Sequence, residues 1–417
     1  MARRSNGQRN SRKHDIVLLG ATGYTGLLTA EYIVRHLPTN LKWAIVGRSE
    51  SKLEALAKKL KDLEPDRLQP EVEAISFDDR NQLDSVIRDS KVCISVVLYW
   101  KVGEVIVKSC VENQTDYIDV AGDVPILRTF IEKYHDAATK AGVALIHLCG
   151  AFGGPQDLLT WMTVRELAQK ASRKTKEVVL SITEFELAPS GGTASSMMAM
   201  STYDPQVLKQ SRQPWILSPV KGVDISPSTN FLGMRQDPVL GLLSGPTISA
   251  DENRVLVHRA WGLLRNTTQD YGPNFQYNEY NKVSSVAAGI FSMLNTAIVG
   301  FALSFGITRK ILSLVFPAPG EGPDVEKTRR SPVKFEAVAI ADSDDGEEPP
   351  RAYASFSYPS GAYHVTGLLL SQAAASLLYT RNLEGGFAGG CLTPAFLGDD
   401  FLNRIRSAGA TIEAYLV

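Results

Sequence analysis

The sequence predicts an α/β protein in which a doubly wound parallel sheet carries an inserted α+β second domain. Three observations lead to this prediction. Over residues 15–150, apolar runs alternate with helix-like stretches at intervals of about 25 to 30 residues. A glycine-rich turn follows the first apolar run, and from about residue 154 the alternation gives way to period-two strands. At 417 residues the chain is long enough for two or more domains.

The composition excludes several classes of protein. The 44 Lys plus Arg and 45 Asp plus Glu residues leave a net charge of -1, so we expect no nucleic-acid partner. The four cysteines form no C-x-x-C pair and the histidines no H-E-x-x-H motif, so we expect neither a disulfide framework nor a metal site. This cysteine usage fits an intracellular, cytoplasmic setting.

The elements of the first domain follow from periodicity. Residues 50–63 place leucines three and four residues apart, which predicts a helix with one buried face. Residues 1–13 are basic and lack an apolar signal region, so we expect a disordered tail. The six predicted strands are residues 16–19, 43–46, 72–76, 92–97, 117–120 and 143–147.

The first predicted strand ends in a glycine-rich turn that opens a helix. The turn has the spacing G-x-x-G-x-x-G, which aims helix N-terminal N–H groups at a pyrophosphate. We therefore predict a Rossmann-type dinucleotide-binding domain. The cofactor-binding residues expected in this turn are Gly20, Thr22, Gly23, Tyr24, Thr25 and Gly26.

The end of the second predicted strand indicates which cofactor binds. An acidic residue that would hold the ribose 2'-hydroxyl of NAD is missing there, and Arg48 stands at the tip with Ser49 and Lys52 close by. A guanidinium matches the geometry of a 2'-phosphate. This predicts NADP(H); the alternative is that Arg48 is a solvated loop residue.

Other cofactor contacts are expected where the remaining parallel strands end, because ligands bind at the carboxyl edge of such sheets. Asp78 is placed to reach an adenine, although Asp79 or Asn81 capping the next helix explains that turn equally well. Near the nicotinamide we expect Val97 and Leu98 after the fourth strand and Ala121 and Gly122 after the fifth.

Several motifs resemble those of the saccharopine dehydrogenase-like oxidoreductase family. They are GATGYTG at residue 20, VGRSESKLEAL at 46, DYIDVAGDVP at 116, GGTASSMM at 191, PAPGEGP at 317 and GGCLTPAFLGDDFLNRI at 389. The resemblance spans nearly the whole chain. It implies an oxidoreductase, in a family that includes trans-acting enoyl reductases of polyketide-type assembly lines and lipid-droplet-associated proteins of animals.

The sequence also departs from that family. Relatives usually carry Gly-Pro-Tyr after the fourth strand, where this chain reads Leu98-Tyr99-Trp100-Lys101. The segment 149–157 keeps the cysteine, proline and last aspartate of C-G-F-D-S-x-P-S-D and loses the Asp-Ser pair. Both changes predict an altered substrate pocket, or a cofactor-binding protein that reduces nothing.

The second half of the chain is predicted to be a substrate and dimerisation domain. We expect strands at 177–186, 335–340 and 352–358, the last two joined by the acidic loop 342–348. A helix is expected to begin near residue 191, and the helix 394–408 to return to the first domain. The predicted divisions are the tail 1–13, the dinucleotide domain 14–153, the second domain 154–385 and the return 386–417.

Residues 283–308 form a run of 26 residues without a charge. As one helix the run would be roughly 39 Å long, enough to cross a bilayer. Glycines, serines and an asparagine dilute it. Three interpretations remain: a buried or hydrophobic-surface helix pair, attachment to a membrane surface or lipid droplet, or a spanning helix.

Candidate catalytic groups are few. None of the 14 tyrosines is followed by a lysine four residues later, so the tyrosine-lysine mechanism of short-chain dehydrogenases is not expected. The remaining candidates are Tyr99, Lys101 and Asp157, for which the alternatives are a packing tyrosine, a solvated lysine and a helix-capping aspartate.

Three functions compete on this basis. The first is an NADP(H)-dependent, enoyl-reductase-like enzyme acting on a hydrophobic or carrier-bound, polyketide- or lipid-like substrate, in secondary-metabolite biosynthesis. The second is a lipid-droplet or membrane protein with a vestigial nucleotide fold. The third is a cofactor-binding scaffold that catalyses a non-redox isomerisation or cyclisation. A homodimer fits each of them.

Overall fold

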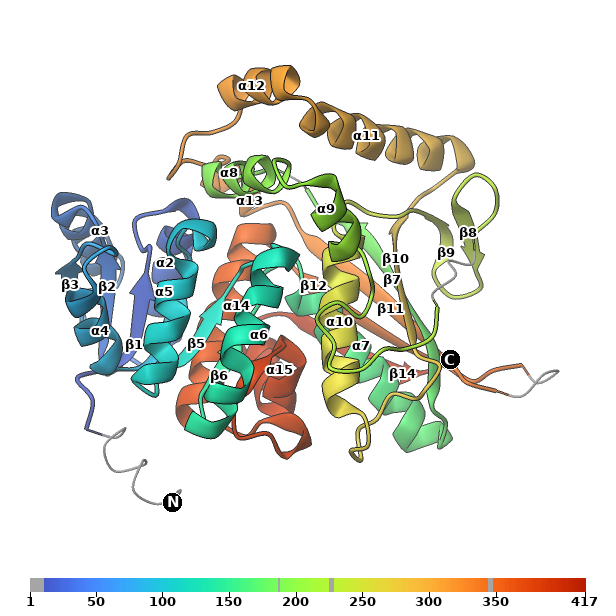
Figure 1. The fold of residues 1–417 in the computed structure, drawn as a ribbon, viewed down its shortest axis with the longest axis horizontal. Coiled ribbons are helices and arrows are strands. Elements are labelled where there is room, and N and C mark those ends of the chain that lie inside the picture. The colour runs from blue at the N-terminus through green and yellow to red at the C-terminus, as the bar shows by residue number, and fades with distance from the viewer. Residues whose placement is uncertain (1–10, 187, 225–228, 344–347) are drawn as a thin grey trace.

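The computed structural model describes residues 11–186, 188–224, 229–343 and 348–417, and it contains two seven-stranded sheets (Figure 1). The first sheet is parallel throughout and has helices packed on it, whereas the second is mixed. The predicted fold class, a Rossmann-type α/β domain joined to a second domain, is confirmed.

The first sheet has the strand order β13-β6-β5-β4-β1-β2-β3, which is doubly wound about β1. Its strands are β1 (His14–Leu19), β2 (Trp43–Gly47), β3 (Glu71–Ala74), β4 (Ser90–Ser95), β5 (Asp116–Asp119), β6 (Ala144–Ile146) and β13 (Gly390–Leu392). The helices that connect the first six are α2 (Tyr24–His36), α3 (Glu50–Leu63), α4 (Arg80–Arg88), α5 (Tyr99–Glu112) and α6 (Val124–Ala141).

The periodicity predictions for this sheet hold because its central strands are buried on both faces and therefore read as apolar runs. All six predicted strands are present, and α3 begins and ends at the predicted residues with Leu53, Leu56 and Leu60 buried. Strand β13 was not predicted. It has three residues, which is too short to show a period, and only its pairing with β6 makes it a strand.

The second sheet has the order β14-β12-β11-β7-β10-β9-β8. Strands β7 and β10 run parallel and every other pair is antiparallel, which confirms the predicted mixed sheet. The strands are β7 (Thr175–Glu184), β8 (Met234–Asp237), β9 (Gly241–Ser244), β10 (Gln276–Lys282), β11 (Val333–Ala341), β12 (Arg351–Tyr358) and β14 (Thr411–Leu416). The middle of the acidic loop, residues 344–347, lies outside the described residues.

Helices from the second half cover both sheets. Helix α7 packs on β11 and β12, whereas α14 packs on α2 and β4 of the first sheet. The return to the first domain at residue 386 stays a prediction. Because α14 already packs on the first sheet, we propose that the chain returns to the first domain at α14. These helices are α7 (Gly154–Glu166), α8 (Gly191–Met200), α9 (Pro205–Ser211), α10 (Ala250–Leu264), α11 (Val286–Ser304), α12 (Gly306–Val315), α13 (Val325–Thr328), α14 (Ala362–Tyr379) and α15 (Gly398–Ser407).

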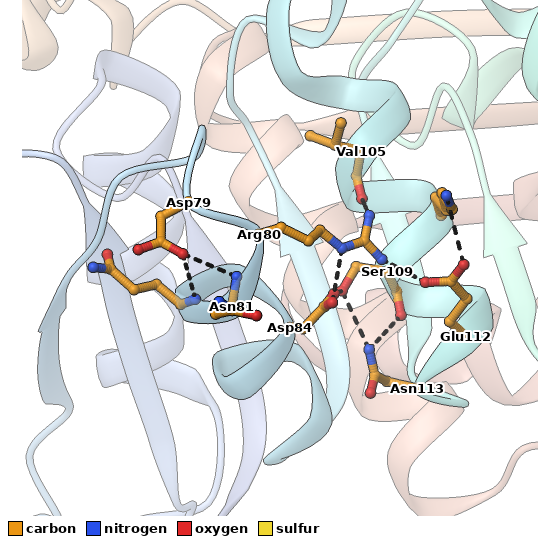
Figure 2. Close-up of polar contacts among 10 residues, drawn as sticks. Asp79, Arg80, Asn81, Asp84, Val105, Ser109, Glu112 and Asn113 are labelled. Carbon is orange, nitrogen blue, oxygen red and sulfur yellow. Dashed lines mark hydrogen bonds and ion pairs between the residues drawn. The ribbon is translucent and has the colours of Figure 1, made fainter.

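A polar network fixes α4 against α5 (Figure 2). The Arg80 guanidinium donates to Asp84 at 2.7 Å within α4, and to the Val105 carbonyl at 3.3 Å and Glu112 at 2.5 Å in α5. Ser109 of α5 also donates to Asp84. The network holds the start of α4, and with it the loop after β3, in one position.

The N-terminal segment is anchored as soon as it enters the described part of the chain. Arg12 donates to the Ser90 carbonyl at 2.6 Å and to Thr115 Oγ1 at 2.8 Å. Lys13 pairs with Glu71 and Glu73. Residues 1–10 of the predicted tail lie outside the described residues.

The uncharged run forms α11 and the start of α12, and this helix pair lies along one edge of the molecule beside α8 (Figure 1). Gly289 is the only buried residue of α11 and α12 has none, so the first interpretation is wrong in its buried form and agrees with the structure in its hydrophobic-surface form. Helix α11 has 19 residues and a mean hydropathy of 1.9 over its most apolar window, so by length and composition it could cross a membrane.

Candidate active site

The glycine-rich turn after β1 leaves no room for side chains at two of its positions. Gly20 has φ +82°, and a Cβ there would lie 3.1 Å from the Val96 carbonyl group. A Cβ on Gly26 would lie 2.2 Å from the Gly20 oxygen. These contacts bring the start of α2 close against β1 and β4. The requirement for glycine that the sequence indicated therefore has a steric cause.

The first turn of α2 is suited to binding an anion. Its N-cap residue, Gly23, offers no side chain to the free N–H groups of the turn, which leaves them for a ligand. Thr22 packs near Gly47 at the end of β2, and the Thr25 carbonyl accepts a bond from Thr29 at 2.8 Å. These free N–H groups make the turn a candidate pyrophosphate site.

Two cations stand at the tip of β2. Arg48 and Lys52 are exposed, and neither forms an ion pair or hydrogen bond within the part of the chain that the structure describes. Ser49 precedes α3 as its N-cap residue, and its hydroxyl lies 3.2 Å from that of Ser51. Unpaired basic groups beside the expected ribose position are what a 2'-phosphate requires.

The next three loops also line the carboxyl edge of the sheet. Asp79 caps α4 by accepting from the N–H groups of Asn81 and Gln82, as the capping alternative predicted, and Asp78 is exposed. Val97 Cγ1 is the side-chain atom nearest to a Cβ built on Gly20, at 3.2 Å, and Leu98 is the N-cap residue of α5. The remaining predicted contacts are the buried Ala121 and the partly exposed Gly122.

Tyr24 points from the glycine-rich turn toward the second domain. Its hydroxyl donates to the Pro323 carbonyl at 2.8 Å, and its ring meets that of Tyr363 edge-on at 5.0 Å. A Cβ on Gly322 would lie 2.4 Å from the Tyr24 ring. The PAPGEGP segment therefore lies directly against the cofactor turn, which the sequence did not indicate.

Tyr99 is the predicted catalytic candidate that faces the second domain across the carboxyl edge of the sheet. It is the first residue of α5, and its hydroxyl hydrogen-bonds that of Ser196 in α8. Burial raises the pKa of Tyr99, although the bond to Ser196 opposes this effect, so the phenol keeps its proton at neutral pH.

A second contact joins the same parts of the molecule. Tyr203, just after α8, donates to Asp123 Oδ2 at 2.8 Å, and Asp123 in turn caps α6. Burial raises the pKa of the Asp123 carboxyl. Sequence reasoning missed Ser196, Tyr203 and Asp123 as site residues. Two of them lay in motifs already noted, since Asp123 ends DYIDVAGD and Ser196 belongs to GGTASSMM.

The structure does not bring the other two candidates to Tyr99's hydroxyl. Lys101 is exposed on α5, and its side chain has no ion pair or hydrogen bond with any described residue. Asp157 has no exposed surface and accepts from the Ala395 N–H at 2.8 Å. This contact ties α7 to the C-terminal segment, which favours a structural role for Asp157.

Asp157 makes stability depend on pH. Burial raises the pKa of its carboxyl to about 7, although hydrogen bonds from Thr393 and Ala395 oppose the effect. Because the folded-state pKa lies above that of an unfolded aspartate, its contribution is full below pH about 4 and is lost as pH rises through 7. We expect the free energy of unfolding in urea to fall between pH 5 and 8, and to fall less in Asp157→Asn.

The exposed Asp399 supplies the control for that measurement. It pairs with Arg165 at 2.7 Å near the same C-terminal segment, and its carboxyl is well solvated. Asp399→Asn should leave the difference in stability between pH 5 and pH 8 as it is in the parent protein. An equal difference in Asp157→Asn and the parent would contradict the assignment.

A buried histidine stabilises the loops after β5 and β6. Asp119 lies 3.0 Å from His147 Nδ1 and also accepts from the N–H of Ala121 at 3.1 Å. Burial by itself lowers the pKa of His147, but the Asp119 carboxylate outweighs it and raises the pKa to about 10. The pair therefore keeps the Ala121 backbone in place at the edge where the nicotinamide is expected.

The fold and this edge of the sheet define a dinucleotide-dependent oxidoreductase: a glycine-rich turn on a parallel sheet, free cations at the β2 tip and a partly buried tyrosine that contacts α8. Residues 16–146 match the family model of the saccharopine dehydrogenase NADP binding domain. Over this domain the chain is similar to saccharopine dehydrogenases, and the protein is an NADP-dependent oxidoreductase.

Its relatives match along nearly their whole length. The chain is 27% identical over 423 residues to a trans-acting enoyl reductase of Mycobacterium ulcerans, covering 97% of this chain and 98% of the relative. It is 28% identical over 420 residues to a trans-acting enoyl reductase of Mycobacterium tuberculosis, covering 96% and 97%. The fold is similar to that of an apo saccharopine dehydrogenase (L-Glu forming) from Saccharomyces cerevisiae, with a TM-score of 0.54, 14% identity and coverage of 96% and 99%.

Proposed function

We propose that the protein is an NADPH-dependent reductase of an α,β-unsaturated, hydrophobic acyl group, carried as a thioester of the polyketide or lipid type. The observation that carries the proposal is the position of Tyr99, a protonated phenol at the carboxyl edge of the sheet, opposite α8. The mycobacterial relatives named trans-acting enoyl reductases support the choice of bond. A role in secondary-metabolite biosynthesis is part of the same proposal.

The roles of the residues follow from the geometry. When bound, NADPH supplies a hydride to the carbon β to the thioester carbonyl. The glycine-rich turn would hold its pyrophosphate, and Arg48 with Lys52 its 2'-phosphate. Tyr99 would donate the proton that the α-carbon takes up, with Ser196 holding the hydroxyl in position. Both new C–H bonds are then accounted for.

Helix α8 gives the site an apolar wall. Its sequence, GGTASSMMAM, contains no charge, and the side chains of Met197, Met198 and Met200 are partly exposed. Methionine side chains adapt to apolar ligands of varied shape, which suits an acyl chain. The contacts from Ser196 to Tyr99 and from Tyr203 to Asp123 join α8 and the residues after it to the dinucleotide domain, which supports this role.

The proposal is tested by incubating the purified protein with NADPH and 2-octenoyl-N-acetylcysteamine as an apolar enoyl thioester. We expect one NADPH to be oxidised for each thioester reduced, with NADH a poor substitute. Turnover of a thioester substrate without loss of NADPH absorbance would instead indicate the isomerase or cyclase alternative. No NADPH binding by calorimetry at millimolar cofactor would overturn the proposal.

The alternative of a vestigial nucleotide fold is less well supported. The unpaired cations at the β2 tip and the free N–H groups of the first turn of α2 are groups that a working cofactor site uses, which supports the reductase. The exposure of α11 and α12 favours only the membrane-contact part of that alternative. A cytoplasmic location and a homodimer remain compatible with the reductase.

A further inference from the structure

The helices α11 and α12 turn apolar faces away from the protein. In α11, Phe291 is 74% exposed, and the other large apolar residues follow it at spacings of three and four. In α12, Ile307 and Leu314 are 79% and 83% exposed. A soluble helix with this spacing buries such a face. The outward residues are Phe291, Leu294, Ile298 and Phe301 of α11, Phe305 between the two helices, and Ile307, Ile311, Leu314 and Val315 of α12.

Helix α11 is held to the protein near both of its ends. Near the start of α11, Ser244 Oγ donates to the Gly289 carbonyl at 3.0 Å. After the turn into α12, Arg309 donates to the Ser201 carbonyl beyond α8 at 2.8 Å. A helix that crossed a bilayer would leave its two ends on opposite sides of the membrane. Attachment at both ends to one protein body therefore fits a helix pair that lies flat along a surface.

The charges of this segment have one sign. No aspartate or glutamate occurs between Glu279 and Glu321, whereas Lys282, Arg309 and Lys310 are basic. Lys282 pairs with Glu336 at 2.9 Å, and the exposed side-chain ammonium of Lys310 has no ion pair or hydrogen bond among the described residues. An apolar face bordered by unpaired positive charge is complementary to an anionic lipid surface.

A second copy of the chain is the main competing occupant, because spacings of three and four also suit a helix-helix seam. Such a seam is specified by charged residues beside it, and protein interfaces have a polar rim. Helix α11 has no charged residue at all. A lipid surface requires no such partner-specific charges. We propose that α11 and α12 form a docking surface for an anionic lipid membrane, with both outward faces in the acyl boundary and Lys310 at the headgroups.

The test uses the full chain and extruded vesicles of phosphatidylcholine with 30% phosphatidylserine (roughly a physiological upper range of anionic lipid), compared with phosphatidylcholine alone. We expect co-sedimentation with the anionic vesicles. Phe301→Glu with Leu314→Glu should lower the vesicle affinity by about tenfold or more. Lys310→Ala should lower it about fivefold on anionic vesicles and leave binding to neutral vesicles unchanged.

The matched control is Leu68→Glu, which places the same charge on an exposed leucine of the dinucleotide domain. It should bind vesicles like the parent, and all variants should keep the parent's melting temperature. Equal sedimentation of the α11–α12 variants and the parent, or no sedimentation of the parent, would overturn the proposal. So would a concentration-dependent dimer, seen by light scattering, that Phe301→Glu dissociates.

Discussion

Tyr99→Phe is expected to lower kcat for the enoyl thioester by about a hundredfold or more, since a positioned proton donor contributes about 10²- to 10⁴-fold. The ring remains and only the hydroxyl that bonds Ser196 is lost. NADPH affinity, measured by fluorescence, should be unchanged, because no predicted cofactor contact is altered. Stopped-flow absorbance under single-turnover conditions measures the reductive step directly.

Substituting Ser196 distinguishes a residue that positions the proton donor from the residue that donates the proton. It contacts the substrate-side hydroxyl of Tyr99 and, at 3.9 Å, only the sulfur of Met200 in its own helix. Ser196→Ala should therefore cost about tenfold in kcat, less than loss of the phenol. As a control, Tyr379→Phe removes a hydroxyl from a half-exposed tyrosine far from the cofactor edge. A Tyr99→Phe enzyme that works within threefold of the parent would exclude Tyr99 as proton donor.

Removing the cations at the β2 tip is expected to weaken NADPH selectively. Each charge-assisted hydrogen bond contributes about 1.5 to 3 kcal/mol, so Arg48→Ala should raise the Kd for NADPH by about ten- to a hundredfold. Lys52→Ala should have a smaller effect in the same direction, because an ammonium acts as a point charge. The Kd for NADH should hardly change, because NADH lacks the 2'-phosphate. Calorimetry with both nucleotides measures the effect.

Lys58→Ala is the control for those variants. Lys58 lies on α3 as Lys52 does, is exposed, and has no ion pair or hydrogen bond in the described ranges. The Lys58→Ala variant removes the same charge as Lys52→Ala, at a position more than one helical turn further from the β2 tip. If Arg48→Ala weakened NADPH and NADH equally, Arg48 would support the loop rather than the phosphate, and the solvated-loop alternative would gain support.

Local signals were sufficient for the dinucleotide domain. The glycine-rich turn predicted its own geometry, because Gly26 packs against Gly20, six residues earlier. The end of β2 likewise places Arg48 and Lys52 within one short segment. The predicted strands and α3 follow from apolar periods in consecutive residues, which burial on both faces of a parallel sheet imposes.

Signals were weaker where contacts join distant segments. Tyr99 was one of three equal catalytic candidates, and only its contact with Ser196, 97 residues later, separates it from Lys101 and Asp157. Asp157 read as a helix-start aspartate, whereas its partner is the Ala395 N–H, 238 residues away. No local pattern carries such a pairing, because it depends on how the two sheets pack.

The sequence alone determined the fold class, the glycine-rich turn and the cofactor, since each depends on residues that are neighbours in the chain. Tertiary structure decided the rest. It placed the PAPGEGP segment against Tyr24, brought α8 over the carboxyl edge of the sheet, and left α11 and α12 exposed. An apolar helical period is the same whether its face meets a core, a membrane or water, so only the packing of the whole chain could decide between these environments.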